Sequence, residues 1–120
     1  MSINNHIELA NRNCLACEGD YPSLQASAIK IYLEQLHTSW QIIDEKKIKQ
    51  TFKFKSFLEA IDFVNKIAKV AEKEGHHPDI YIFYNQVTIE LWTHAIAGLS
   101  ENDFIIAAKI EKIIDEIKKA

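Results

Sequence analysis

The sequence predicts an α+β fold in which helices cover one face of a four-stranded antiparallel sheet. Three observations lead to this fold class. Residues 47–55 alternate between one face that carries the apolar Ile48, Phe52 and Phe54 and an opposite face that carries the lysines, as in a half-buried antiparallel strand. Three other segments repeat apolar residues with helical spacing, and short turns join the strand candidates in pairs. We therefore expect the order α-β-β-α-β-β-α in a single domain over residues 1–120, with an irregular lead at residues 1–20.

Each helix is predicted from its caps as well as from its apolar spacing. Ser23 can cap the first helix. Ser56 and Glu59 form a capping box for the second helix, and Gly75 follows as its C-terminal stop. The apolar faces expected to pack on the sheet are Ile29, Tyr32, Leu33 and Leu36, then Phe57, Ile61, Val64, Ala68 and Ala71, then Ile106, Ile110, Ile113 and Ile117.

The last helix carries more apolar side chains than packing on one sheet face requires. Ser100 is its predicted N-cap, with Asp103 three residues later. Phe104, Ile105 and Ala108 widen its apolar face. This additional area is either core or a contact between subunits.

The first strand pair consists of residues 39–44 and residues 47–55, joined by a turn at residues 45–46. In the second of these strands, apolar and polar side chains point to opposite faces. The face expected to meet the helices carries Ile48, Gln50, Phe52 and Phe54.

The second strand pair has histidines at both ends. Residues 79–84 and 87–92 read as two strands with a turn at residues 85–86. If that turn has two residues, His77 lies directly opposite His94, with Cβ atoms about 4.5–5.5 Å apart. The hairpin therefore predicts a meeting of imidazole rings at one end.

A one-residue bulge would pair His76 with His94 instead, so either register brings a histidine from each end together. Pro78 cannot donate to the ladder, so we expect the strands to separate there and leave a mouth. Imidazole exchanges protons near neutral pH. Glu72 lies one helical turn before His76 and is placed to set its tautomer or charge. These residues predict an acid/base site for a small molecule.

Two other interpretations of the histidines remain open at the level of sequence. The rings can be surface side chains without chemistry, which is common for a single histidine. Three histidines can also hold a zinc ion with one open coordination position. However, the neighbours His76 and His77 on extended backbone point to opposite sides, which suits a single metal ion poorly.

The bulk properties exclude several classes of function. No apolar run is long enough to span a bilayer, and the amino-terminal segment lacks the pattern of a signal peptide, so we expect a cytoplasmic protein. The net charge of -3, with lysines spread along the chain, argues against direct nucleic-acid binding. Cys14 and Cys17 lack the strand-helix context of a redox motif and a second ligand pair for zinc, so we interpret them as ordinary thiols.

A specific spacing of residue types runs through the second half of the chain. The phrase at residues 84–111 and the segments at residues 14–36 and 39–42 extend the pattern over nearly the whole chain. The spaced residues are Glu72, His76-His77-Pro78, Tyr84, His94 and Asp103.

This pattern resembles the signature of the pterin-4a-carbinolamine dehydratases of bacteria. The resemblance implies a hydro-lyase that dehydrates 4a-hydroxytetrahydropterin to the quinonoid dihydropterin and so recycles the cofactor of aromatic amino acid hydroxylases. It implies the fold predicted above and homodimers or homotetramers, in which sheets join edge to edge and helices pack between subunits. It implies no metal and no organic cofactor.

Matched to the signature, His76, His77 and His94 are the expected catalytic residues. On our hypothesis His76 and His94 act as acid and base, His77 orients the substrate, and Glu72 supports His76. The expected substrate-binding residues beside them, partly through backbone groups, are Gly75, Thr93 and Ala95, together with Glu72.

The chain departs from the family pattern at three positions. Ile80 stands where a tryptophan is frequent, Gly75 where a polar or acidic residue is frequent, and Trp92 where a smaller residue is common. Animal relatives also serve as dimerisation partners of a transcription factor. An alternative function is therefore a dimerisation or regulatory module without significant catalysis.

Overall fold

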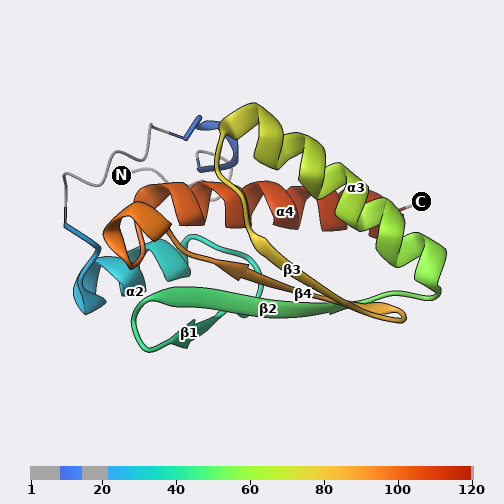
Figure 1. The fold of residues 1–120 in the computed structure, drawn as a ribbon, viewed down its shortest axis with the longest axis horizontal. Helices are drawn as coiled ribbons and strands as arrows, with labels where there is room; N and C mark the ends of the chain where they lie inside the picture. Colours follow the sequence, from blue (N-terminus) through green and yellow to red (C-terminus); the bar gives the residue numbers. More distant parts are fainter. Residues whose placement is uncertain (1–8, 15–21, 120) are drawn as a thin grey trace.

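A computed structural model describes residues 9–14 and 22–119 of the 120-residue chain (Figure 1). Residues 9–11 form a helical turn, ahead of the longer elements. The remaining elements are α2 (Ala26–Glu34), β1 (Gln41–Ile43), β2 (Lys47–Lys53), α3 (Phe57–Glu74), β3 (Asp79–Phe83), β4 (Gln86–Leu91), the 3-10 helix η1 (His94–Ile96) and α4 (Glu101–Lys119).

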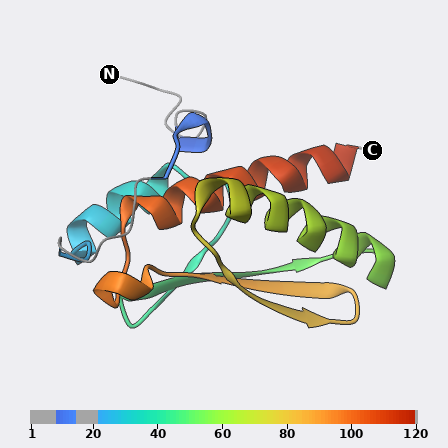
Figure 2. The same ribbon diagram turned by 45° about the horizontal axis from the view of Figure 1, so that its top comes forward.

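The four strands form one antiparallel sheet in the order β1-β2-β4-β3. The three long helices lie on one face of this sheet, and none of the described helices covers the other face (Figure 2). This arrangement confirms the predicted α+β class and the predicted order of elements. In the described part of the chain, no helix combines the length and apolar character needed to cross a membrane.

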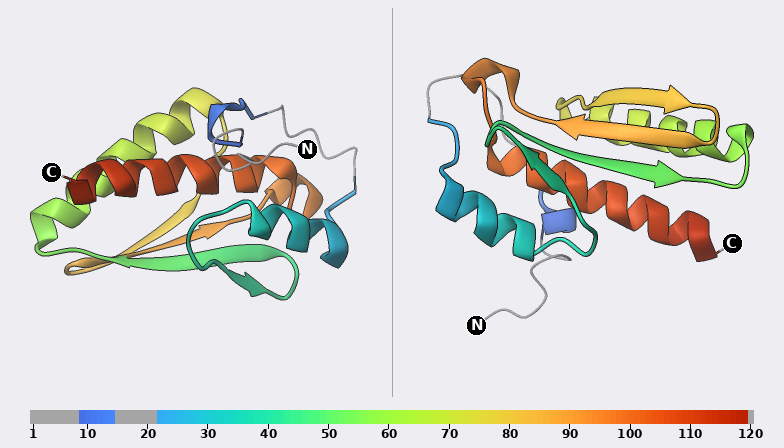
Figure 3. Two further views of the ribbon diagram at one scale, coloured as in Figure 1. Left: turned by 180° about the vertical axis from the view of Figure 1, so that it is seen from behind. Right: turned by 90° about the horizontal axis from the view of Figure 1, so that it is seen from below.

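The core is centred on α4, which lies between α3 and α2 on the covered face of the sheet (Figure 3). The helical turn at residues 9–11 packs against α4. Leu9 is fully buried there, and the Ala10 carbonyl lies 2.6 Å from the Lys109 ammonium on α4. Phe104, Ile105 and Ala108 are all at most 1% exposed. The wide apolar face of α4 is therefore core within this chain.

Helix α3 packs through a stripe that shares Ala71 with the predicted one and otherwise differs from it. Its N-cap is as expected, because the Ser56 hydroxyl accepts from the Glu59 amide at 3.1 Å. Phe57, in contrast, is 48% exposed. The helix carries two neighbouring apolar stripes, and the one that includes Ala60 faces the core. The buried residues are Ala60, Phe63, Ile67 and Ala71.

Helix α2 begins later than predicted, with Gln25 rather than Ser23 as its N-cap. The loop that leads from α2 to β1 is held by a buried carboxylate on α4. Glu111 accepts hydrogen bonds from the Thr38 amide at 2.8 Å and from the Trp40 indole at 3.0 Å. A carboxylate with several donors is satisfied in the core, and it fixes the start of the sheet against α4.

The β3-β4 hairpin has a different register from the predicted one. Val87 pairs with Ile82 rather than with Tyr84, and the turn consists of Tyr84 and Asn85. Asn85 binds to Phe54, the residue that follows β2: its side-chain amide donates to the Phe54 carbonyl at 2.9 Å, and its carbonyl accepts from the Phe54 amide at 2.8 Å. These bonds hold Asn85 beside the end of β2. The turn therefore begins at Tyr84, one residue earlier than predicted.

Candidate functional site

His76 lies in the link between α3 and β3 and is buried, with 6% exposed. Gly75 ends α3 in the left-handed conformation, with φ of 69°, as its predicted role as a helix stop requires. The turn directs the His76 ring toward the start of α4, where Nε2 lies 2.6 Å from Oδ1 of Asp103. In Figure 1 this link crosses α4 in its amino-terminal half.

The Asp103 carboxylate, in the first turn of α4, is fully buried and is shared by several hydrogen-bond partners. Besides His76, its Oδ2 accepts from the Ser100 amide and from the Thr93 hydroxyl, both at 2.9 Å. The Ser100 hydroxyl donates in turn to the Thr93 oxygen at 2.8 Å, because the Thr93 proton points to Asp103. Three donors converge on one carboxylate, so its acceptor positions are satisfied without solvent.

His77 has a separate carboxylate partner on the surface. Its Nε2 lies 2.6 Å from Oε2 of Glu72, and the two side chains are 59% and 79% exposed. The expectation that Glu72 supports His76 was therefore wrong: Glu72 contacts His77, and Asp103 contacts His76. The exchange follows from backbone direction, because neighbouring residues in the extended link point to opposite sides.

His94 does not lie across the ladder from His76 or His77, so the predicted cross-strand meeting was wrong. The ladder ends at the pair formed by Asp79 and Glu90. Beyond it the chain turns into η1, which begins at His94 and leaves the ring exposed. His94 is connected to His76 only indirectly. Thr93, the residue before His94, and His76 both bind the Asp103 carboxylate.

The loop around η1 is fixed at both ends. Thr93 and Gly98 bridge each other, with the Thr93 amide 2.8 Å from the Gly98 carbonyl. Ala95 lies in η1 and is exposed, whereas Thr93 is 1% exposed. Gly98 approaches the segment before α2 so closely that a Cβ there would lie 2.6 Å from the Ser23 Cβ. The backbone beside His94 is thus set by contacts with two other segments.

Trp92 and Asp103 are site neighbours whose part in orienting the histidines the sequence did not indicate. The Trp92 and His94 rings stack with centroids 3.8 Å apart, and the Trp92 indole donates to Asp79 at 3.0 Å. Asp103 was expected only as a helix-capping residue and a member of the spaced pattern. Its distance from His76 depends on how α3 and α4 pack, which local spacing does not report.

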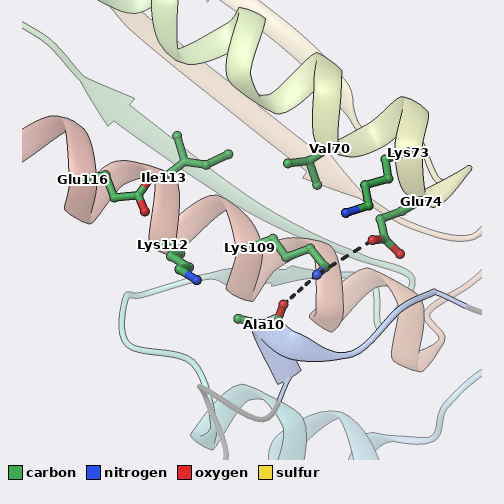
Figure 4. A pocket seen from close by; sticks show the side chains of 8 residues that line it. All are labelled: Ala10, Val70, Lys73, Glu74, Lys109, Lys112, Ile113 and Glu116. Carbon is green, nitrogen blue, oxygen red and sulfur yellow. Dashed lines mark hydrogen bonds and ion pairs between the residues drawn. The ribbon is translucent and has the colours of Figure 1, made fainter.

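Two pockets open between α3 and α4, and the described residues that line them include no histidine. One, of about 250 Å³, is lined by lysine and glutamate side chains, by the apolar Val70 and Ile113, and by Ala10 (Figure 4). There Lys109 lies between the Ala10 carbonyl and the Glu74 carboxylate, at 2.6 and 3.8 Å. Lys109 is thus engaged within the chain, and this pocket is separate from the histidine site.

The described residues form neither a metal site nor a pair of thiols. Within residues 9–14 and 22–119, no group of three or more His, Cys, Asp or Glu side chains is arranged to hold a metal ion. Cys14 is half-buried, with its Sγ 3.7 Å from the Asn102 carbonyl. Cys17 lies outside the described residues, so the interpretation of the two cysteines as ordinary thiols stays a prediction.

Comparisons of the sequence with a family profile and with individual proteins indicate the same family. The sequence profile of the family described as pterin 4 alpha carbinolamine dehydratase matches residues 22–113. A relative from Alkaliphilus metalliredigens, provisionally named pterin-4-alpha-carbinolamine dehydratase, is 46% identical over 104 residues, which are 87% of this chain and 94% of that protein. A relative of the same name from Nitrosomonas eutropha is 45% identical over 112 residues, 93% of this chain and 98% of that protein.

A solved structure shows the same fold. The protein from Brucella melitensis, described as a transcriptional coactivator/pterin dehydratase, has a TM-score of 0.72 and 37% identity, and the match covers 76% of this chain and 97% of that chain. The match of the family profile over most of the chain and the identity to relatives over nearly their full length agree. The chain belongs to the pterin 4 alpha carbinolamine dehydratase family, whose members are hydro-lyases.

Proposed function

We propose that this protein dehydrates 4a-hydroxytetrahydropterin to the quinonoid dihydropterin by histidine acid/base catalysis. The observation that carries the proposal is the buried contact between His76 and Asp103, which shares its carboxylate with Thr93 beside His94. An imidazole held by a buried carboxylate has a fixed orientation, with the proton of Nε2 directed to the acceptor. Such a ring is suited to move one proton at a defined position.

The reaction needs two proton transfers. One group protonates the 4a-hydroxyl, which leaves as water, and another removes a proton from a ring nitrogen, which closes the new double bond. We assign these two transfers to His76 and His94 and the orientation of the substrate to His77, whose partner is Glu72. Gly75, Thr93 and Ala95 line the substrate beside these rings. The proposed steps need no metal and no organic cofactor.

The proposed role of the reaction is to return the oxidised pterin of aromatic amino acid hydroxylases to the pool that a reductase accepts. The family and the relatives from Alkaliphilus metalliredigens and Nitrosomonas eutropha are named for the dehydration step, and the link to the hydroxylases is part of the proposal.

The test is the rate at which purified protein accelerates the loss of 4a-hydroxytetrahydropterin. We expect His76→Ala and His94→Ala each to lower kcat by about 10²–10⁴-fold, the usual contribution of a positioned acid or base. His37→Ala removes an exposed histidine that follows α2 and serves as the matched control. Near-full activity of His94→Ala with intact fold would contradict the assignment of the two transfers.

We also propose that the protein is a homodimer joined through the edge of its sheet. Among the described strands β3 has one neighbour, β4, so its other edge offers backbone groups that no described strand pairs. Its side chains are unusually apolar for an exposed edge: Phe83 is 63% exposed and Tyr84, in the turn, is 71% exposed. A second copy of the same strand would cover both the backbone groups and these rings.

The regulatory interpretation makes a different prediction for the same assay. A dimerisation module without catalysis would leave the decay of 4a-hydroxytetrahydropterin at its uncatalysed rate, although the protein is folded. The relative from Brucella melitensis, described by both roles, makes this alternative worth measuring. Acceleration that depends on His76 and His94 would exclude it as the sole function.

A further inference from the structure

Trp92 lies between the end of β4 and the start of η1, two residues before His94. Its indole and the His94 imidazole stack with ring centroids 3.8 Å apart and ring planes 33° from parallel. Trp92 is half-buried, whereas His94 is exposed. Among the described residues, this ring contact is the one interaction that the structure shows for the His94 side chain.

The indole is itself held from two other strands. Its Nε1 donates to the Asp79 carboxylate, at the start of β3, at 3.0 Å. The Lys47 ammonium, at the start of β2, lies 5.0 Å from the ring centroid and 3.4 Å from Oε1 of Glu90. A cation over an indole face is attracted to it. Trp92 is therefore a fixed surface against which the exposed side chain of His94 rests.

The three histidines of the site differ in what orients them. His76 and His77 each engage Nε2 with a carboxylate, at 2.6 Å in both cases. The contact of His94 is made through the face of its ring. A face contact restricts the two side-chain torsions but occupies neither nitrogen, so both nitrogens remain able to exchange protons with a substrate. This is the arrangement required of a group that gives or takes a proton at an exposed site.

We propose that Trp92 is a positioning residue that fixes the imidazole of His94, and that Asp79 fixes Trp92 in turn. The inference rests on the proposed dehydratase function only in requiring that His94 exchange a proton with the substrate. A misplaced acid or base loses rate because the reacting atoms no longer meet at the required distance and angle.

The first arm of the test is independent of activity. Ring protons that lie over an indole face resonate upfield, so the His94 ring protons should be shifted upfield in the NMR spectrum of the labelled wild-type protein. The His94→Ala spectrum identifies these signals by their loss. We expect Trp92→Leu to remove the upfield shift, Trp92→Phe to retain part of it, and Asp79→Ala to reduce it.

The second arm measures dehydration kinetics of the same proteins. Trp92→Leu should lower kcat by about 10- to 100-fold with a smaller change in KM, because it misplaces a proton-transfer group. Trp92→Phe, which keeps an aromatic face, should restore most of kcat. Phe57→Leu is the matched control, since it removes an aromatic ring that is 48% exposed at the start of α3.

The two arms separate the failure of this inference from the failure of the proposed function. His94 ring protons without an upfield shift in the wild type would overturn the inference. So would a wild-type kcat in Trp92→Leu when His94→Ala has lost activity. Full activity of His94→Ala would instead contradict the proposed role of His94, and the NMR arm would still decide whether Trp92 fixes the ring.

Discussion

Asp103 serves the fold and the site with the same carboxylate. Its Oδ2 accepts from the Ser100 amide at the start of α4, and its Oδ1 contacts His76. His76, Thr93 and Ser100 all donate to this carboxylate. An asparagine side chain in its place has an NH₂ group on one end, and this group would lie against at least one of these donors. An unsatisfied buried group of this kind costs about 1–3 kcal/mol.

We predict that Asp103→Asn lowers the free energy of unfolding by about 1–3 kcal/mol and lowers kcat, because His76 loses its acceptor. Urea unfolding and the dehydratase assay measure the two effects. Asp115→Asn, the same change at an exposed position on α4, should change neither. Wild-type kcat in Asp103→Asn would show that His76 does not need this partner.

Tyr32 gives the stability of the protein a dependence on alkaline pH. Burial raises the pKa of the Tyr32 phenol, the Glu101 carboxylate raises it further by charge and hydrogen bond, and Arg12 opposes them. The folded state therefore keeps a proton that the unfolded state releases near pH 10. The corresponding stability is fully present below that pH and is lost as the pH rises through the raised pKa.

Tyr32→Phe removes this titration. We predict that between about pH 9 and pH 11 the wild type loses more stability than Tyr32→Phe does. Urea unfolding of both proteins across this range provides the measurement. Equal losses in the two proteins would mean that the phenol titrates alike in the folded and unfolded states.

At the scale of elements, the turn between β1 and β2 stores backbone strain. Asp44 and Glu45 have φ of 54° and 57°, and the Lys46 amide closes the turn on the Ile43 carbonyl at 2.9 Å. A left-handed conformation costs an ordinary residue about 1–2 kcal/mol, and asparagine less. The strain falls on an exposed turn, so it can be relieved without loss of contacts.

We predict that Glu45→Asn raises the free energy of unfolding by about 0.5–1 kcal/mol. The matched control is Lys46→Asn, in the same turn at a position without positive φ. A shift of the urea midpoint in the first variant alone is the expected result. Equal midpoints for Glu45→Asn and the wild type would show that the turn bears no such strain.

The sequence predicts the elements well and their contacts less well. All four strands and the three long helices occur in the predicted order and close to the predicted positions, because these signals are local, although α2 begins after Gln25 rather than after Ser23. The buried stripe of α3 was wrong, since Phe57 and Ala60 belong to two apolar stripes and only packing against the sheet chooses between them. The partners of His76 and His77 depend on that packing as well.

The hairpin shows the same limit on a smaller scale. The turn was expected at Asn85 and Gln86 because asparagine favours turns. Asn85 is in the turn, but its bonds to Phe54, the residue that follows β2, hold it beside the end of that strand. A contact between residues 31 positions apart thus decided a register that the local pattern alone could not decide.

At the scale of the whole molecule, the exposed edge of β3 sets the expected assembly. We predict that the wild type has twice the mass of one chain by light scattering. Phe83→Lys should yield monomers, because it places a charge at the joined edge. Ile31→Lys puts the same charge on α2, where the side chain is 58% exposed, and should leave the dimer intact. Dissociation by Ile31→Lys alone would place the contact on the helices.

The close approach of Gly98 to Ser23 constrains how the sequence can vary. Any side chain at position 98 would collide with the Ser23 Cβ, at 2.6 Å, in the segment before α2. The two positions can therefore change only in a particular order, with position 23 becoming glycine before position 98 acquires a side chain. Gly98→Ala should be harmful in the present background and far better tolerated with Ser23→Gly. The loop that carries His94 therefore depends on the size of the side chain at position 23, far earlier in the sequence.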